Sequence, residues 1–99
     1  MDERERVDRL LAGTGMAFAE EPLGERAWRF TTAEGDVQAD VQIVDADPAA
    51  AAARLHEREG DLASHNGLIV FRVRYTGDDT GIAGTIRAAT VAAALAGEE

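Results

Sequence analysis

The sequence predicts a small α+β domain. We expect a mostly antiparallel sheet of three or four strands, packed by two or three helices in the order α-β-β-β-α-β-α. Period-two alternation of apolar and polar residues at 28–31 and 37–43 is typical of paired strands with one buried face. The apolar run at 68–71 is typical of a central strand. Alanine-rich stretches at 49–53 and 80–96 indicate helices. The length of 99 residues favours one domain spanning residues 1–99.

The N-terminal part begins with a short helix that ends at Gly13. Val7, Leu10 and Leu11 have the i, i+3, i+4 spacing of one apolar helical stripe. Residues 16–21 alternate only weakly, so a strand there is one of two possibilities. The segment 22–24 (Pro-Leu-Gly) predicts a turn, because proline presets φ and glycine tolerates a positive φ.

A hairpin follows. Its arms are 28–31 and 37–43, and its turn is 33–36, with Gly35 where a positive φ is needed. A second helix starts with Asp47 as N-cap and Pro48 at its first position, and Gly60 marks its end. Its expected buried stripe is thin and comprises Ala51, Ala52, Leu55 and Leu62. The segment 65–67 (His-Asn-Gly) predicts a turn before the strong strand at 68–75.

The last helix, at 80–96, carries one charged residue, Arg87, and two apolar faces. One face holds Ile82, Ile86, Ala89 and Ala93. The nearly opposite face holds Gly84, Ala88, Val91 and Leu95. A helix that is apolar around most of its circumference is buried on two sides. We therefore expect the face with Ile82 to join the core and the face with Gly84 to meet a second copy or another protein. The predicted core comprises Trp28, Phe30, Val41, Ile43, Ile69, Phe71, Val73, Ile82 and Ile86.

The composition excludes several classes of protein. The chain has a net charge of −9, ten arginines, no lysine, twenty alanines and no cysteine. It therefore has no disulfide, thiolate metal site or cysteine nucleophile, and its acidity disfavours binding to a phosphate backbone. No apolar run is long enough to span a membrane. The charged N-terminus does not have the pattern of a secretory signal, which leaves a cytoplasmic location as the expectation. The acids are dispersed, as in a solvated surface, and such a composition is typical of salt-loving organisms.

The loop at 77–85 is the best candidate for a ligand site. A strand, a glycine-rich turn and a helix N-terminus form a generic anion site, here with Gly77, Gly81, Gly84 and Thr85 as binding residues. The spacing matches neither the Walker nor the dinucleotide pattern, and Asp78 and Asp79 would repel a phosphate. Capping of the helix by Asp79 or Thr80 accounts for the same residues. The calcium-loop pattern is also absent, so we expect no metal.

No residue pattern indicates catalysis. His56 begins three letters of the zinc-protease motif, but Gly60 stands where its second histidine is required. Ser64 is the only serine, and no base with an orienting partner accompanies it. We therefore expect neither an enzyme nor a cofactor.

Three functions remain. The first is a non-enzymatic protein-interaction or adaptor module, dimeric through the last helix. The second is an acidic inhibitor or nucleic-acid mimic that occupies a basic cleft. The third is a small-molecule or nucleotide binder at the 77–85 loop. In size, charge and element order the chain loosely resembles the small acidic dimeric chaperones of bacterial secretion systems, although the predicted order has one strand fewer before the final helix.

Overall fold

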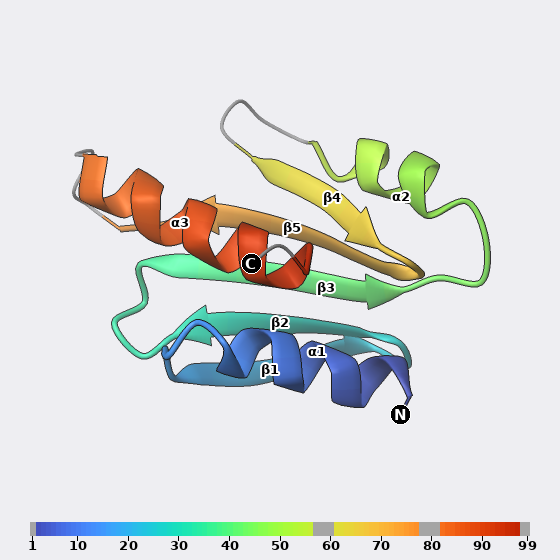
Figure 1. Cartoon of the computed structure of the whole chain (residues 1–99), viewed down its shortest axis with the longest axis horizontal. Coiled ribbons are helices and arrows are strands. Elements are labelled where there is room, and N and C mark those ends of the chain that lie inside the picture. Colours follow the sequence, from blue (N-terminus) through green and yellow to red (C-terminus); the bar gives the residue numbers. More distant parts are fainter. Residues whose placement is uncertain (1, 57–60, 78–81, 98–99) are drawn as a thin grey trace.

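The fold is a five-stranded antiparallel sheet with three helices in the described part of the chain (Figure 1). The structure is a computed structural model and describes residues 2–56, 61–77 and 82–97. The sheet has the strand order β1-β2-β3-β5-β4, which confirms the α+β class with one strand more than predicted. The elements are α1 (Glu3–Ala12), β1 (Phe18–Gly24), β2 (Ala27–Thr32), β3 (Val37–Ile43), α2 (Pro48–Arg54), β4 (Leu62–Asn66), β5 (Ile69–Tyr75) and α3 (Ile82–Leu95).

The additional strand is β4, which pairs with β5 from Leu62↔Val73 to Asn66↔Ile69. The turn predicted at 65–67 is therefore wrong by two residues: His65 and Asn66 belong to the strand, and Gly67, with φ of +60°, begins the hairpin turn. An Asn-Gly pair before a strong strand is a hairpin signal. The strand was missed because 62–66 contains no β-branched or aromatic residue.

The segment 16–21, for which a strand was one of two possibilities, contributes to β1, which continues to Gly24. Pro22 lies inside it, opposite Trp28, and the register shifts between Pro22 and Gly24. The turn predicted at 22–24 is therefore wrong. A proline is tolerated there because β1 is an edge strand, where its missing N–H breaks no ladder bond on the outer side. The turn at 33–36 is confirmed, with φ of +74° at Gly35.

The helices α1 and α3 lie on one face of the sheet. α1 lies over β1 and β2, and α3 lies over β3 and β5 (Figure 1). Between them and the sheet is the apolar core, with Val7, Leu11, Val91 and Leu95 from the helices. The guanidinium of Arg4 stacks on Trp28 at 4.9 Å from the ring centroid and attaches α1 to the sheet.

One hydrogen-bonded chain joins both terminal helices to the sheet. Arg6 of α1 donates to Oδ1 of Asn66 at 2.6 Å, and Nδ2 of Asn66 donates to the carbonyl of Leu95 in α3 at 3.2 Å. Asn66 is half-buried at the end of β4. Its amide supplies both the acceptor and the donor, which no apolar residue of similar size could do.

The predicted core is confirmed in part. Its buried members are Phe30, Val41, Ile43, Ile69, Phe71 and Val73. Trp28 is only half-buried. The prediction is wrong for Ile82 and Ile86, which are 78% and 57% exposed. α3 instead turns its other face to the sheet, because small residues let the helix approach the strands closely.

The second helix also differs from the expectation. Asp47 occupies the N-cap position, but with φ of +52° its side chain makes no capping bond, while Pro48 does begin the helix. α2 ends at Arg54, and only Ala52 of the predicted stripe is buried within it. Leu55 is the half-buried C-cap, and Leu62 belongs to β4. The predicted end at Gly60 lies outside the described residues.

The other face of the sheet carries a row of charges across its centre. Arg29, Asp40 and Arg72 are direct cross-strand neighbours in β2, β3 and β5. Nε of Arg29 donates to Asp40 at 2.9 Å, and a terminal nitrogen of Arg72 donates to its second oxygen at 2.6 Å. The Asp40 and Arg72 side chains are only 12% and 8% exposed. Arg72 also donates to the carbonyl of Leu55, which places the end of α2 on this face.

The charge row fixes the pKa of Asp40. Burial alone would raise that pKa, but the hydrogen bonds and charges of Arg29 and Arg72 outweigh it and hold the pKa below its ordinary value. Asp40 is therefore ionised at neutral pH, and both arginines keep their counter-ion.

Replacement of Asp40 should cost far more stability than replacement of an exposed ion-paired aspartate. We expect Asp40→Asn to lower the free energy of unfolding by about 2 kcal/mol, because Arg72 would lose a charged partner in a buried site. The matched control is Asp45→Asn, whose partner is Arg26 and whose side chain is 89% exposed. It should cost less than about 1 kcal/mol. Urea denaturation of the three proteins measures both values, and equal losses would contradict the assignment.

The same carboxylate should make the protein sensitive to acid. A pKa that is lower in the folded state than in the unfolded state adds stability above the unfolded value, and that stability is lost as the pH falls through the folded value. The free energy of unfolding should thus fall below about pH 4, the ordinary range of aspartate. The fall should be smaller in Asp40→Asn. Denaturation curves from pH 7 to pH 2.5 test this, and parallel curves for the two proteins would refute it.

Candidate functional site

The candidate site is the solvent side of α3. Ile82, Ile86, Ala89 and Ala93 of α3, and Ala96 directly after it, repeat at intervals of four, three, four and three residues, so they share one side of the helix. The two isoleucines and Ala89 are exposed, whereas Ala93 and Ala96 are half-buried and Ala96 also packs against the core. We call these five residues the outer face. It carries no charge, and its two isoleucines are the most exposed large hydrophobic residues in the described part of the chain.

The residues predicted to form a partner interface lie on the inner side instead. Gly84, Ala88, Val91 and Leu95 are all buried against the chain's own sheet. They cannot contact a partner while the domain is folded. The four residues therefore face the sheet, whereas Ile82 and Ile86 of the other face are exposed to solvent.

A cavity of about 500 Å³ continues the outer face toward the edge of the sheet. Ala89, Ala92, Ala93 and Ala96 form its helical wall, and Leu62 and Phe71 form part of its apolar lining. It exists because alanine side chains are too short to fill the space between α3 and β4. The alanine end of the outer face is therefore hollow, whereas the isoleucine end projects into solvent.

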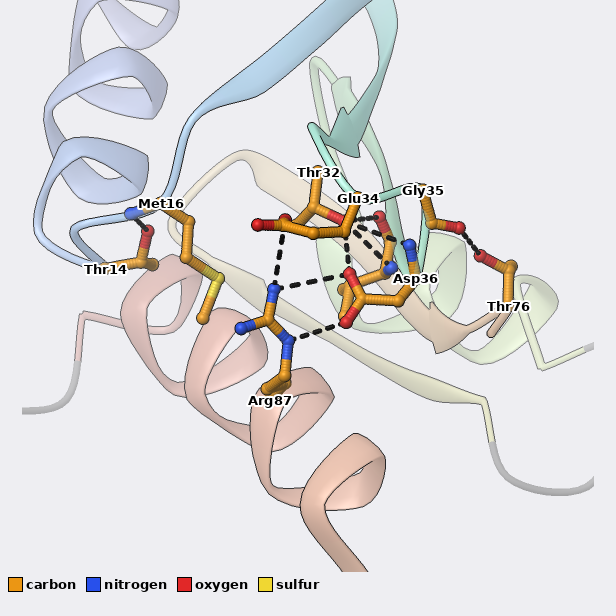
Figure 2. A network of polar contacts seen from close by, with 9 residues as sticks. Thr14, Met16, Thr32, Glu34, Gly35, Asp36, Thr76 and Arg87 are labelled. Carbon is orange, nitrogen blue, oxygen red and sulfur yellow. Dashed lines mark hydrogen bonds and ion pairs between the residues drawn. The ribbon is translucent and has the colours of Figure 1, made fainter. Parts of the chain in front are cut away.

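A polar network holds α3 against the β2–β3 turn (Figure 2). Nε of Arg87 donates to Asp36 at 2.6 Å, and a terminal nitrogen donates to Glu34 at 3.4 Å. The hydroxyl of Thr32 donates to Asp36 at 2.6 Å and accepts from two backbone N–H groups at the start of β3. Figure 2 shows Arg87 pointing toward these groups. The only charged side chain of α3 is thus directed to the turn and away from the outer face.

This network also lowers the pKa of Asp36. The hydrogen bond from Thr32, and then that from Arg87, holds the pKa of Asp36 below its ordinary value. The pKa of Arg87 is raised by its hydrogen bond to Asp36. Both groups therefore stay charged, and the ion pair that orients the helix persists over the physiological pH range.

The glycines of the predicted anion loop have a structural explanation. A Cβ built on Gly84 or on Gly77 would lie closer than 3.0 Å to atoms of the Tyr75 side chain. A side chain at either position would therefore require the Tyr75 ring to move. Thr85 is exposed, while Gly81, Asp78, Asp79 and Thr80 lie outside the described residues. The described atoms therefore supply no separate sign of a phosphate site.

The described residues also bring together no catalytic constellation. His56, Ser64 and Asp61 line the same cavity, although the sequence gives no reason to connect them. The Asp61 side chain is 1% exposed and accepts a hydrogen bond from Arg74 at 3.1 Å. The described hydrogen bonds include none between His56 and Ser64. Nor do these residues contain a group of three or more side chains that could hold a metal ion.

None of the helices in the described segments has the length and apolar character required to cross a membrane. Comparison with protein-family models, with curated proteins and with solved structures finds no match to this chain. The loose resemblance to secretion chaperones therefore carries no argument about function, and the site must be interpreted from its own chemistry.

The contact between Tyr75 and Gly84 can be tested by a double-mutant cycle. Gly84→Ala should lower the free energy of unfolding by about 1–3 kcal/mol, because the tyrosine ring must move to admit the new methyl group. In a Tyr75→Val background the same change should cost less, since alanine favours a helix over glycine by up to about 1 kcal/mol. Thermal and urea denaturation of the four proteins measure the coupling. A cost that is the same in both backgrounds would mean that the ring is not the obstacle.

Proposed function

We propose that this protein is a non-enzymatic protein-interaction or adaptor module that binds through the outer face of α3. The exposure of Ile82 and Ile86 on an uncharged helix face is the observation that carries the proposal. The alanine-lined cavity beside them extends the same surface.

The energetic argument is simple. Transfer of an isoleucine side chain from water to an apolar contact stabilises by about 1.5–3 kcal/mol. The outer face holds two such side chains in solvent, and the chain's own sheet does not cover them. Scattered exposed apolar residues are common, but a continuous apolar strip beside a cavity is typical of an interaction site.

The two other functions have less support. For an acidic mimic, the carboxylates should remain free, but seven carboxylates in the described segments pair with arginines of the same chain: Asp8, Glu20, Glu34, Asp36, Asp40, Asp45 and Asp61. For a nucleotide binder at the 77–85 loop, Gly77 and Gly84 would need a role beyond their contact with Tyr75. The cytoplasmic location and the salt-loving source stay predictions.

The proposal predicts that charge on the outer face abolishes association. The double variant Ile82→Asp/Ile86→Asp should lose at least tenfold in affinity for any protein partner, its own copies included. Its thermal stability should change little, because both side chains are exposed. The measurement combines chemical cross-linking in an extract of the source cells with sedimentation of the purified chain.

The matched control is Leu23→Asp/Leu68→Asp, which adds the same two charges at exposed leucines outside α3. It should associate as the wild-type protein does. The proposal fails if the wild-type protein associates with nothing, or if the outer-face variant and the control associate equally.

A further inference from the structure

We propose that the outer face binds the outer face of a second copy, with the two α3 helices antiparallel about a two-fold axis at Ala89. This inference rests on the proposed function and names its partner. The arrangement is isologous, so each copy uses the same surface. It brings Ile82 opposite Ala96 of the other copy and Ile86 between Ala92 and Ala93, while Ala89 meets its own equivalent.

The shape of the outer face complements that of an antiparallel copy. Its N-terminal half projects, because Ile82 and Ile86 are largely exposed. Its C-terminal half is hollow, because Ala89, Ala93 and Ala96 border the cavity. An antiparallel copy puts each projecting half against a hollow half. A parallel copy would instead place isoleucine against isoleucine and leave both cavities empty, which loses the packing of large against small side chains.

The acidity of the chain restricts the surfaces through which two copies can meet. Each copy has a net charge of −9, so most ways of bringing two copies together place carboxylates near one another. Contact through the outer face desolvates no ionised group of α3, since Arg87 is held by Asp36 and Glu34. The antiparallel order also sets the positive end of each helix dipole beside the negative end of the other. The remaining repulsion between the two acidic bodies is screened by salt.

The small area of the outer face limits the affinity of one copy for another. A helix of 14 residues is about 21 Å long, and a strip about 10 Å wide along it covers roughly 200 Å². A stable interface buries about 800 Å² on each partner. Even with Leu62 beside the cavity, α3 supplies only part of that area. We therefore expect a weak and reversible dimer that forms at high protein concentration and strengthens with added salt.

The absence of cysteine allows a direct test of the register. Ala89→Cys places one thiol on the proposed axis, so mild oxidation should convert the purified chain to a covalent dimer. Ile82→Cys should give only the background level of Leu23→Cys, because position 82 meets position 96. The double variant Ile82→Cys/Ala96→Cys should cross-link again. Background cross-linking by Ala89→Cys, or efficient cross-linking by Ile82→Cys alone, would overturn the proposal.

A second experiment tests the same pairing without oxidation. Ile86→Lys and Ala93→Asp should each weaken self-association at least tenfold, and an equimolar mixture should recover it, because the mixed dimer pairs the two new charges. Sedimentation at a series of protein and salt concentrations measures each case. A mixture that stays as weak as its components would overturn the antiparallel register.

The outcomes separate the two proposals. If the purified wild-type chain is monomeric at every concentration and salt level, the second copy is not the partner. The proposed function then survives only if cross-linking in the extract still captures a protein through Ile82 and Ile86. If that capture is also absent, both proposals fail.

Discussion

The fold is governed by a shortage of large apolar side chains. Twenty alanines leave enough bulk to fill one side of the sheet, where Phe30, Phe71 and Leu95 form a core under α1 and α3. The opposite side is covered in part by α2, with Ala52 buried, and in part by a row of charges. Asp40 lies between Arg29 and Arg72 on three adjacent strands, and each arginine satisfies one of its oxygens. Such a row adds little net stability compared with an apolar one, but a slip of one residue would break both pairs. The charge row therefore helps to define the register of β2, β3 and β5 on the side where apolar packing is limited to α2.

The same shortage shapes α3. Close approach to the sheet needs small residues at Gly84 and Ala88, since the Tyr75 ring lies against the helix there. Val91 and Leu95 then reach the core from the next turns. The bulkiest residues of the helix, Ile82 and Ile86, are excluded from this narrow space. Their exposure follows from packing geometry, and it leaves an apolar surface that the chain itself does not cover.

The sequence was informative where one force dominated. Alternation predicted β2 and β3, and the apolar run predicted β5, because burial of one or both strand faces leaves a direct pattern. It was uninformative where burial was partial. β4 has neither β-branched nor aromatic residues, and β1 contains Pro22. For α3 the pattern defined two faces correctly but not their orientation. Hydrophobicity favoured Ile82 for the core, whereas close contact with Tyr75 selected Gly84. The cavity depends on how α3 and β4 meet, which no local pattern records.

The hydrogen-bonded chain from Arg6 through Asn66 to Leu95 constrains how the protein can assemble during synthesis. Arg6 lies 60 residues before its partner, and Asn66 lies 29 residues before the carbonyl to which it donates. The helix α1 is made before Asn66, so one of the groups that hold it in place emerges from the ribosome much later than the helix itself. Contacts of such separation form slowly, since the intervening chain must close first. During synthesis α1 can therefore dock on β2 through Arg4 and Trp28 at an early stage, whereas its contact through Arg6 must wait for Asn66 and the contact from Asn66 to α3 must wait for Leu95.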